Sequence, residues 1–186
     1  MSGVRPFEAR IVACLPPAAA GAPAEWAATM SAAGVDGLAL DGTPADLPAR
    51  ALLWALRAAT PLPLELHVPP GADLTSQDPA GLDLDWLIPA DPPSPEAEAM
   101  WKAAGVGLAW PLGTPFPQRP ARVHAWSPVE PVAWEAVPAG AERSLRLDPE
   151  GLAGAWAGVD TVVVPGEALA GTDPGAEVAR WRGRRP

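Results

Sequence analysis

The sequence predicts a reduced (β/α)8 barrel of the TIM type, and two observations support this fold class. Short β-rich runs alternate along the chain with alanine-rich helical stretches, which is the pattern of a parallel α/β fold. Eight apolar runs of strand length can be counted in the 186 residues. An open sheet with fewer strands is the alternative, but eight strands favour a closed barrel.

The elements follow one another in a regular order. We expect strands at residues 10–15, 37–40, 64–68, 85–89, 106–110, 122–126, 144–147 and 161–164. We expect helices at residues 23–33, 47–59, 95–104 and 149–157, and a charged C-terminal helix around residues 174–182. Pro23, Pro95, Pro149 and Pro174 each lie near a helix start, where the missing N–H is harmless and the fixed φ favours the first turn.

Three connections, at residues 69–84, 111–120 and 127–143, are too short or too rich in proline for a full helix. A complete (β/α)8 barrel usually needs roughly 200 to 250 residues, so several outer helices should be shortened or missing. Loop prolines, tryptophans or a second subunit would then cover the exposed strand faces, which suggests a homo-oligomer. Residues 1–186 show no linker and no strong internal repeat, so a single domain is expected.

The charge balance excludes several classes of partner. A formal net charge of −9 argues against nucleic acids and acidic membrane surfaces, because the long-range field repels polyanions. Cys14 is the one cysteine, which excludes an internal disulfide. The apolar runs fall short of the roughly 20 residues of a membrane span, and the first residues lack the apolar stretch of a signal peptide. The cytoplasm is therefore the expected compartment.

Three expected strands end on a residue capable of polar chemistry. The segments LALDG, LELHV and LRLDP place Asp41, His67 and Asp148 at or just beyond these ends. In a β/α barrel the carboxyl ends of the strands surround the catalytic mouth. Two carboxylates and one imidazole could therefore converge there.

The order of the segments resembles ribulose-phosphate 3-epimerase along nearly the whole chain. RIVACL resembles the first strand of that family, and MSAAGVDGLALDG resembles its passage from helix 1 to strand 2. TPLPLELHV is similar to the strand 3 segment, which carries a metal-binding histidine in the family. KAAGVGLAWPLGTP resembles strand 5, and LRLDPEGLAGAWAGVDTVVVPGEALAG resembles the stretch from strand 7 through strand 8.

The resemblance implies a metal-dependent isomerase that inverts carbon 3 of a sugar phosphate through an enediolate. It implies Asp41 and Asp148 as the catalytic acid and base, and both aspartates together with His67 as ligands of Zn²⁺, Fe²⁺ or Mn²⁺. Cys14 stands where the family has a serine near the substrate, and Gly166 lies in the loop expected to contact the substrate. Ala39 stands in place of the fourth ligand, a histidine, so the ion would be held weakly or be absent.

The expected phosphate-binding loops also depart from the family. Its glycine-rich loops after strands 6, 7 and 8 present backbone N–H groups to the phosphate. Here the loop after strand 6 has no glycine cluster, Asp148 runs directly into Pro149, and Glu167 follows Gly166. A carboxylate beside a phosphate dianion is repulsive. The resemblance implies a sugar phosphate as the partner, whereas these departures favour a related sugar, so both are kept as expected partners.

Each retained residue also has a structural interpretation. Asp41 before Gly42 is a turn signal, Asp148 before a proline is a helix N-cap candidate, and His67 and His124 could be packed core residues. Two functions stay open: an active epimerase-type enzyme, and a catalytically degenerate barrel that acts as a binding or regulatory protein. Another phosphate-binding barrel, such as a thiamine-phosphate synthase or an indole-pathway isomerase, is a weaker third interpretation, because the same glycines are missing.

Overall fold

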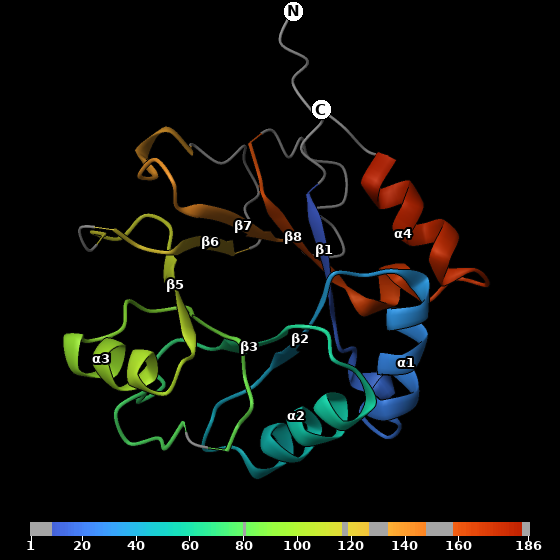
Figure 1. Cartoon of the computed structure of the whole chain (residues 1–186), viewed down its shortest axis with the longest axis horizontal. Coiled ribbons are helices and arrows are strands. Elements are labelled where there is room, and N and C mark those ends of the chain that lie inside the picture. Colours follow the sequence, from blue (N-terminus) through green and yellow to red (C-terminus); the bar gives the residue numbers. More distant parts are fainter. Residues whose placement is uncertain (1–8, 80, 117–118, 127–133, 148–157, 184–186) are drawn as a thin grey trace, which may run out of the picture.

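The eight expected strands close into one parallel barrel (Figure 1). The computed structural model describes residues 9–79, 81–116, 119–126, 134–147 and 158–183. Each strand pairs with its neighbours in chain order, and the last strand returns to pair with the first. The predicted reduced (β/α)8 barrel is therefore confirmed. The strands are β1 (Arg10–Cys14), β2 (Gly37–Asp41), β3 (Leu64–Val68), β4 (Trp86–Pro89), β5 (Gly107–Pro111), β6 (Arg122–Trp126), β7 (Glu142–Arg146) and β8 (Thr161–Pro165).

Within the described residues, four α-helices cover part of the barrel wall. They are α1 (Pro23–Ala33), α2 (Leu47–Ala59), α3 (Pro95–Ala103) and α4 (Pro174–Gly183). Figure 1 shows α4 beside α1, α2 beside β2 and β3, and α3 beside β5. The first turns of α1, α2 and α3 contain a proline, as the sequence predicts for α1 and α3. The helix expected at residues 149–157 lies outside the described residues.

Short 3₁₀ turns precede α1 and α4, and one such turn is the described helical element between β6 and β7. Among the described residues these turns are η1 (Pro17–Ala19), η2 (Trp134–Ala136) and η4 (Gly166–Leu169). No helix is present in the described residues between β3 and β4 or between β5 and β6. The proline-rich connections thus shorten the outer layer, as expected for a barrel of this length.

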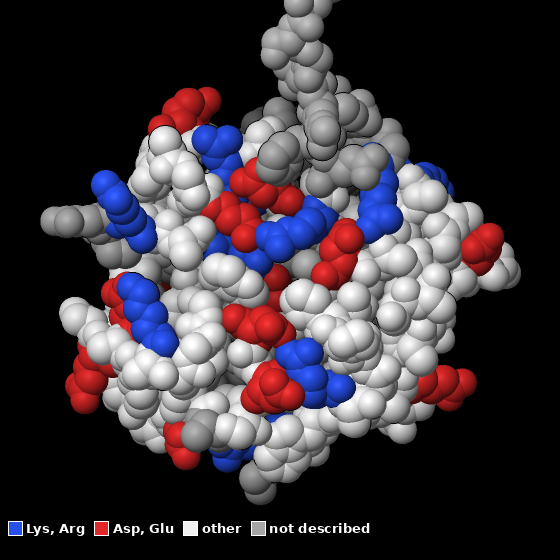
Figure 2. Space-filling view, in the orientation of Figure 1, with Lys and Arg blue, Asp and Glu red and all other residues white. Residues whose placement is uncertain are grey.

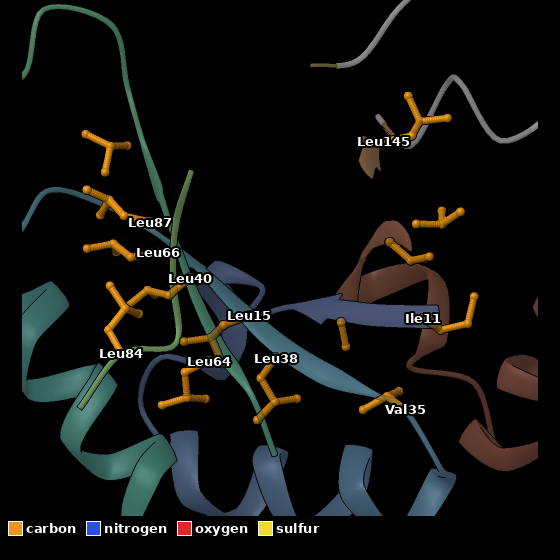
Figure 3. Close-up of a cluster of buried hydrophobic side chains, with 14 of the residues drawn as sticks. Ile11, Leu15, Val35, Leu38, Leu40, Leu64, Leu66, Leu84, Leu87 and Leu145 are labelled. Carbon is orange, nitrogen blue, oxygen red and sulfur yellow. The ribbon is translucent and has the colours of Figure 1, made fainter. Parts of the chain in front are cut away.

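The main apolar core lies between the strands and the helices. Outward-facing residues of β2 and β3, including Leu38, Leu40, Leu64 and Leu66, are at most 4% exposed. Figure 3 shows them gathered in the layer between the strands and the neighbouring helices. Because side chains alternate along a strand, the residues between them face the barrel interior. Polar and charged side chains, among them Glu65 and His67, lie in that interior. Some of them contribute to the candidate functional site.

Three aspartates organise the amino-terminal face of the barrel. Each one directly precedes a strand and accepts a hydrogen bond from the backbone N–H of the neighbouring strand, at 2.8–2.9 Å. The pairs are Ile11 N with Asp36, Leu64 N with Asp85, and Arg143 N with Asp160. Figure 2 shows acidic and basic side chains interleaved over the centre of the face that it presents. We interpret these amino-terminal contacts as stabilising, because catalysis in such barrels takes place at the opposite face.

No helix within the described part of the chain is both long enough and apolar enough to span a membrane.

Candidate functional site

A cavity of about 170 Å³ opens at the carboxyl ends of β1, β2, β7 and β8. This is the face on which β/α barrels carry their active sites. Prolines and apolar side chains form part of its wall, and four side chains supply its polar and sulfur groups. These four are Cys14, Asp41, Arg146 and Glu167.

Asp41 and Arg146 form an ion pair in this cavity. Arg146 Nη1 donates to Asp41 Oδ1, and Arg146 Nη2 donates to Asp41 Oδ2 at 2.7 Å. The pair is therefore bidentate, a geometry that fixes both side chains. The carboxylate of Asp41 is 55% exposed, whereas Arg146 is 19% exposed. The acid thus faces the solvent side of the mouth, and the guanidinium lies beneath it.

The ion pair controls the protonation of Asp41. Partial burial alone would raise the pKa of its carboxyl group, but the hydrogen bonds and positive charge of Arg146 outweigh burial and lower it below the ordinary value. Asp41 is therefore ionised at neutral pH. Because the folded pKa is lowered, the stabilisation from this pair is present above the unfolded pKa and is lost as the pH falls.

His67 lies beneath the ion pair, inside the barrel. It is 1% exposed, and its Nδ1 is 3.2 Å from Arg146 Nη1. Its other ring nitrogen, Nε2, is 3.5 Å from Glu65 Oε2. Burial lowers the pKa of His67 most strongly, and the nearby Glu65 charge compensates only in part. The imidazole is therefore neutral at neutral pH.

A buried ion pair continues from His67 toward the amino-terminal end of the barrel. Glu65, which is 2% exposed, accepts a hydrogen bond from Arg122 Nη1. Arg122 is 1% exposed, lies 3.9 Å from the centre of the Trp86 ring and contacts Glu142 at 2.9 Å through Nη2. Burial would raise the pKa of Glu65, but Arg122 and His67 together lower it. The barrel interior thus contains a chain of paired charges.

Three rings pack together at the inner end of the site. His67, His124 and Trp126 meet edge to face, with ring centres 5.2–5.3 Å apart. The Nδ1 atom of His124 lies 3.0 Å from Ser144 Oγ, and Arg146 lies 5.3 Å from the Trp126 ring centre. The three rings thus pack against one another beside the guanidinium of Arg146.

Cys14 lies beside Asp41 but is not an activated nucleophile. Burial first, and then the negative charge of Asp41, raises the pKa of the thiol to about 12. We expect the folded protein to react slowly with a thiol reagent such as DTNB at neutral pH, and the denatured protein to react at once. Because Cys14 is the one cysteine, the released chromophore reports on it alone. Equal labelling rates for folded and denatured protein would contradict a buried, protonated thiol.

Gly166, expected to contact the substrate, is buried directly after β8 and packs against Cys14 at the end of β1 and against Pro16. A side-chain carbon at this position would meet the carbonyl oxygen of Cys14 and would lie 2.7 Å from Pro16 Cδ. We expect Gly166→Ala to lower the free energy of unfolding in urea by about 1–3 kcal/mol, as overpacked sites do. Gly21→Ala is the control, because no atom lies within 4 Å of that added carbon. Equal free energies of unfolding for the two variants would contradict this prediction, because they would show that the chain around Gly166 accepts the added methyl group without loss of stability.

Two of the three metal ligands that the resemblance implies, Asp41 and His67, lie among the described residues, and both contact a cation. Asp41 and His67 do reach the same mouth, but the cationic Arg146 contacts both of them. No group of three or more potential ligands is found within the described ranges. Asp148, the third expected ligand and second expected catalytic residue, lies outside the described residues. The positive charge beside Asp41 and His67 is therefore that of Arg146.

The partners of the expected residues are not among the predicted site residues, although the sequence holds a pattern that indicates them. These partners are Glu65, Arg122, Glu142 and Arg146. In LELHV, RVHAW and ERSLR, polar or aromatic residues recur at every second position. Because alternate residues of a barrel strand share one face, this spacing indicates a polar barrel interior.

The fold and the mouth place this protein in the class of β/α-barrel proteins, a fold on which many enzymes are built. No family model matches the chain, and the search of curated proteins finds no relative.

Solved structures of the same fold are found. The chain is similar to a tryptophan synthase structure from M. tuberculosis with a TM-score of 0.61 and 15% identity, over 95% of this chain and 94% of that one. It is similar to a tryptophan synthase from Pyrococcus furiosus with a TM-score of 0.56 and 11% identity, over 96% of each chain. For tryptophan synthase subunit alpha from Legionella pneumophila the TM-score is 0.54 and the identity 12%, over 96% of this chain and 86% of that one. At such identities the likeness shows the fold alone.

Proposed function

We propose that this barrel is an epimerase-type isomerase for a small hydroxy-ketone or hydroxy-aldehyde that carries no phosphate group. The proposal keeps the enediolate chemistry that the resemblance to ribulose-phosphate 3-epimerase implies. One observation carries it: a half-exposed, ionised Asp41 is held against the guanidinium of Arg146 in the cavity at the barrel mouth.

In the proposed reaction Asp41 removes the proton from the carbon next to the carbonyl group. The electron pair of that C–H bond moves toward the carbonyl oxygen and forms an enediolate. Arg146 donates hydrogen bonds to this developing oxyanion, in the electrostatic role that a metal ion fills in the resembled family. A second acid returns a proton from the opposite face, and we assign this role to Asp148.

The charges around the cavity favour a neutral substrate. Among the described residues that line it, Arg146 is the one basic side chain, and Asp41 already pairs with it. Glu167 lines the same cavity near the position where the resembled family binds phosphate. Together with the net charge of −9, this carboxylate opposes a phosphate dianion.

A binding or regulatory protein is the second candidate, and the ion pair itself favours it. Arg146 contacts both oxygens of Asp41 and lowers the pKa of its carboxyl group, which weakens Asp41 as a base. In this role the mouth would bind a polar small molecule without turning it over.

Proton exchange in heavy water tests the two candidates. Ribulose, xylulose and ribulose 5-phosphate are each incubated with the protein, with EDTA or with added Mn²⁺, and the carbon 3 proton is followed by NMR. We expect exchange with the unphosphorylated ketoses that EDTA does not remove. Exchange that requires Mn²⁺ would overturn the role given to Arg146, and exchange confined to the phosphate would overturn the neutral substrate. Ligand line broadening without exchange would favour the binding protein.

A further inference from the structure

The buried charges inside the barrel form one connected chain that ends at the mouth. From the amino-terminal side it runs through Glu142, Arg122, Glu65, His67 and Arg146 to Asp41. Its central members are at most 2% exposed. A buried charge is costly unless each polar group is paired, so the orientation of every donor in this chain matters.

The chemistry of arginine fixes the tautomer of His67. A guanidinium has only donors, so the contact between Arg146 Nη1 and His67 Nδ1 at 3.2 Å requires Nδ1 to be the acceptor. The ring proton of the neutral imidazole must then lie on Nε2, the nitrogen that faces Glu65 Oε2 at 3.5 Å. A proton on Nδ1 would set two donors against each other.

Glu65 is the group that stabilises this tautomer. Its Oε1 accepts from Arg122, which leaves Oε2 as the acceptor for the Nε2–H of His67. Arg122 is itself held by Glu142 and by the ring of Trp86. If the carboxylate of Glu65 turned away, Arg122 Nη1 and His67 Nε2 would each lose the acceptor that they face.

We propose that Glu65 is a positioning residue that sets the tautomer of His67 and, through it, holds Arg146 in place beneath Asp41. The consequence for turnover rests on the proposed function, but the tautomer itself does not. Glu65 does not line the cavity at the mouth, and in this proposal it acts only through His67 and Arg146.

Nitrogen-15 NMR of the imidazole rings tests the proposal, because the chain has only two histidines. In the wild-type protein at neutral pH we expect His67 to be neutral and protonated on Nε2, with Nδ1 unprotonated. A doubly protonated ring or the Nδ1–H tautomer in the wild type would overturn the proposal, whether or not any variant folds.

Glu65→Gln with Glu142→Gln as its matched control separates positioning from simple packing. In Glu65→Gln the amide oxygen pairs with Arg122, and its NH₂ group faces His67 Nε2, which must now accept. We expect the main tautomer of His67 to switch to Nδ1–H and the side-chain N–H signals of Arg146 to broaden. Glu142→Gln also alters a partner of Arg122 but does not contact His67, so it should leave the tautomer unchanged. The same shift in both variants, or in neither, would overturn the proposal. Absence of ketose exchange would count against the proposed function only.

Discussion

Replacement of Arg122 by methionine is expected to destabilise the barrel by about 3–5 kcal/mol, the usual cost of removing one partner from a buried ion pair. Arg122 is 1% exposed and contacts Glu65 and Glu142, of which Glu65 is 2% exposed. The substitution leaves the carboxylate of Glu65 in the barrel interior without its cation. Urea unfolding followed by circular dichroism measures the loss.

The same substitution should reverse the effect of pH on the contribution of Glu65. In the wild type the pKa of Glu65 is lowered in the folded state, so its stabilisation is present above the unfolded pKa and is lost as the pH falls. Without Arg122, burial raises that pKa, so the contribution is present in acid and is lost as the pH rises. Urea unfolding curves measured from mildly acidic to neutral pH show whether the contribution of Glu65 to the free energy of unfolding rises or falls with pH.

Two further variants control this prediction. Arg10→Met removes the other cation that contacts Glu142, but Arg10 is 49% exposed, so a loss below about 1 kcal/mol is expected. The double variant Glu65→Leu with Arg122→Met replaces the buried pair with apolar groups and should recover most of the lost stability. If Arg122→Met is as stable as Arg10→Met, the interior pair is not the buried interaction described above.

Asp41→Asn is expected to lower ketose proton exchange about 10²–10⁴-fold, the usual contribution of a general base. The amide keeps the shape of the carboxylate but cannot take a proton from carbon. It also removes the negative charge that Arg146 balances at the mouth. Because the pKa of Asp41 is lowered, its carboxylate stays ionised at neutral pH, and wild-type exchange should be lost only in acid.

Asp46→Asn is the matched control for this variant. Asp46 is exposed before α2, and its side chain makes no capping hydrogen bond, so exchange should stay at the wild-type rate. Full exchange in Asp41→Asn would exclude Asp41 as the base and would leave the enzyme hypothesis without its central residue. Equal losses in both variants would point to an effect of net charge on the assay.

Local sequence patterns predicted the elements of this fold well. The expected strands at residues 64–68 and 122–126 and the helices at residues 23–33 and 47–59 have the bounds that the structure shows. Such elements depend on short-range features, such as apolar runs and a proline in the first helical turn. The chain order of the strands around the barrel also follows from a short-range rule, since parallel neighbours joined by short connections pair in sequence.

The sequence by itself determined a reduced parallel barrel, and it placed Asp41 and His67 at the carboxyl ends of their strands. Only the tertiary structure decided which groups these two residues meet. Arg146 lies 105 residues after Asp41, and Arg122 lies 57 residues after Glu65. No local propensity links residues so far apart, because their contacts depend on barrel closure and on the register between strands. Closure brings a guanidinium to the place where the resemblance implies a metal ion, and for that reason the protonation and chemistry of this mouth follow from the fold.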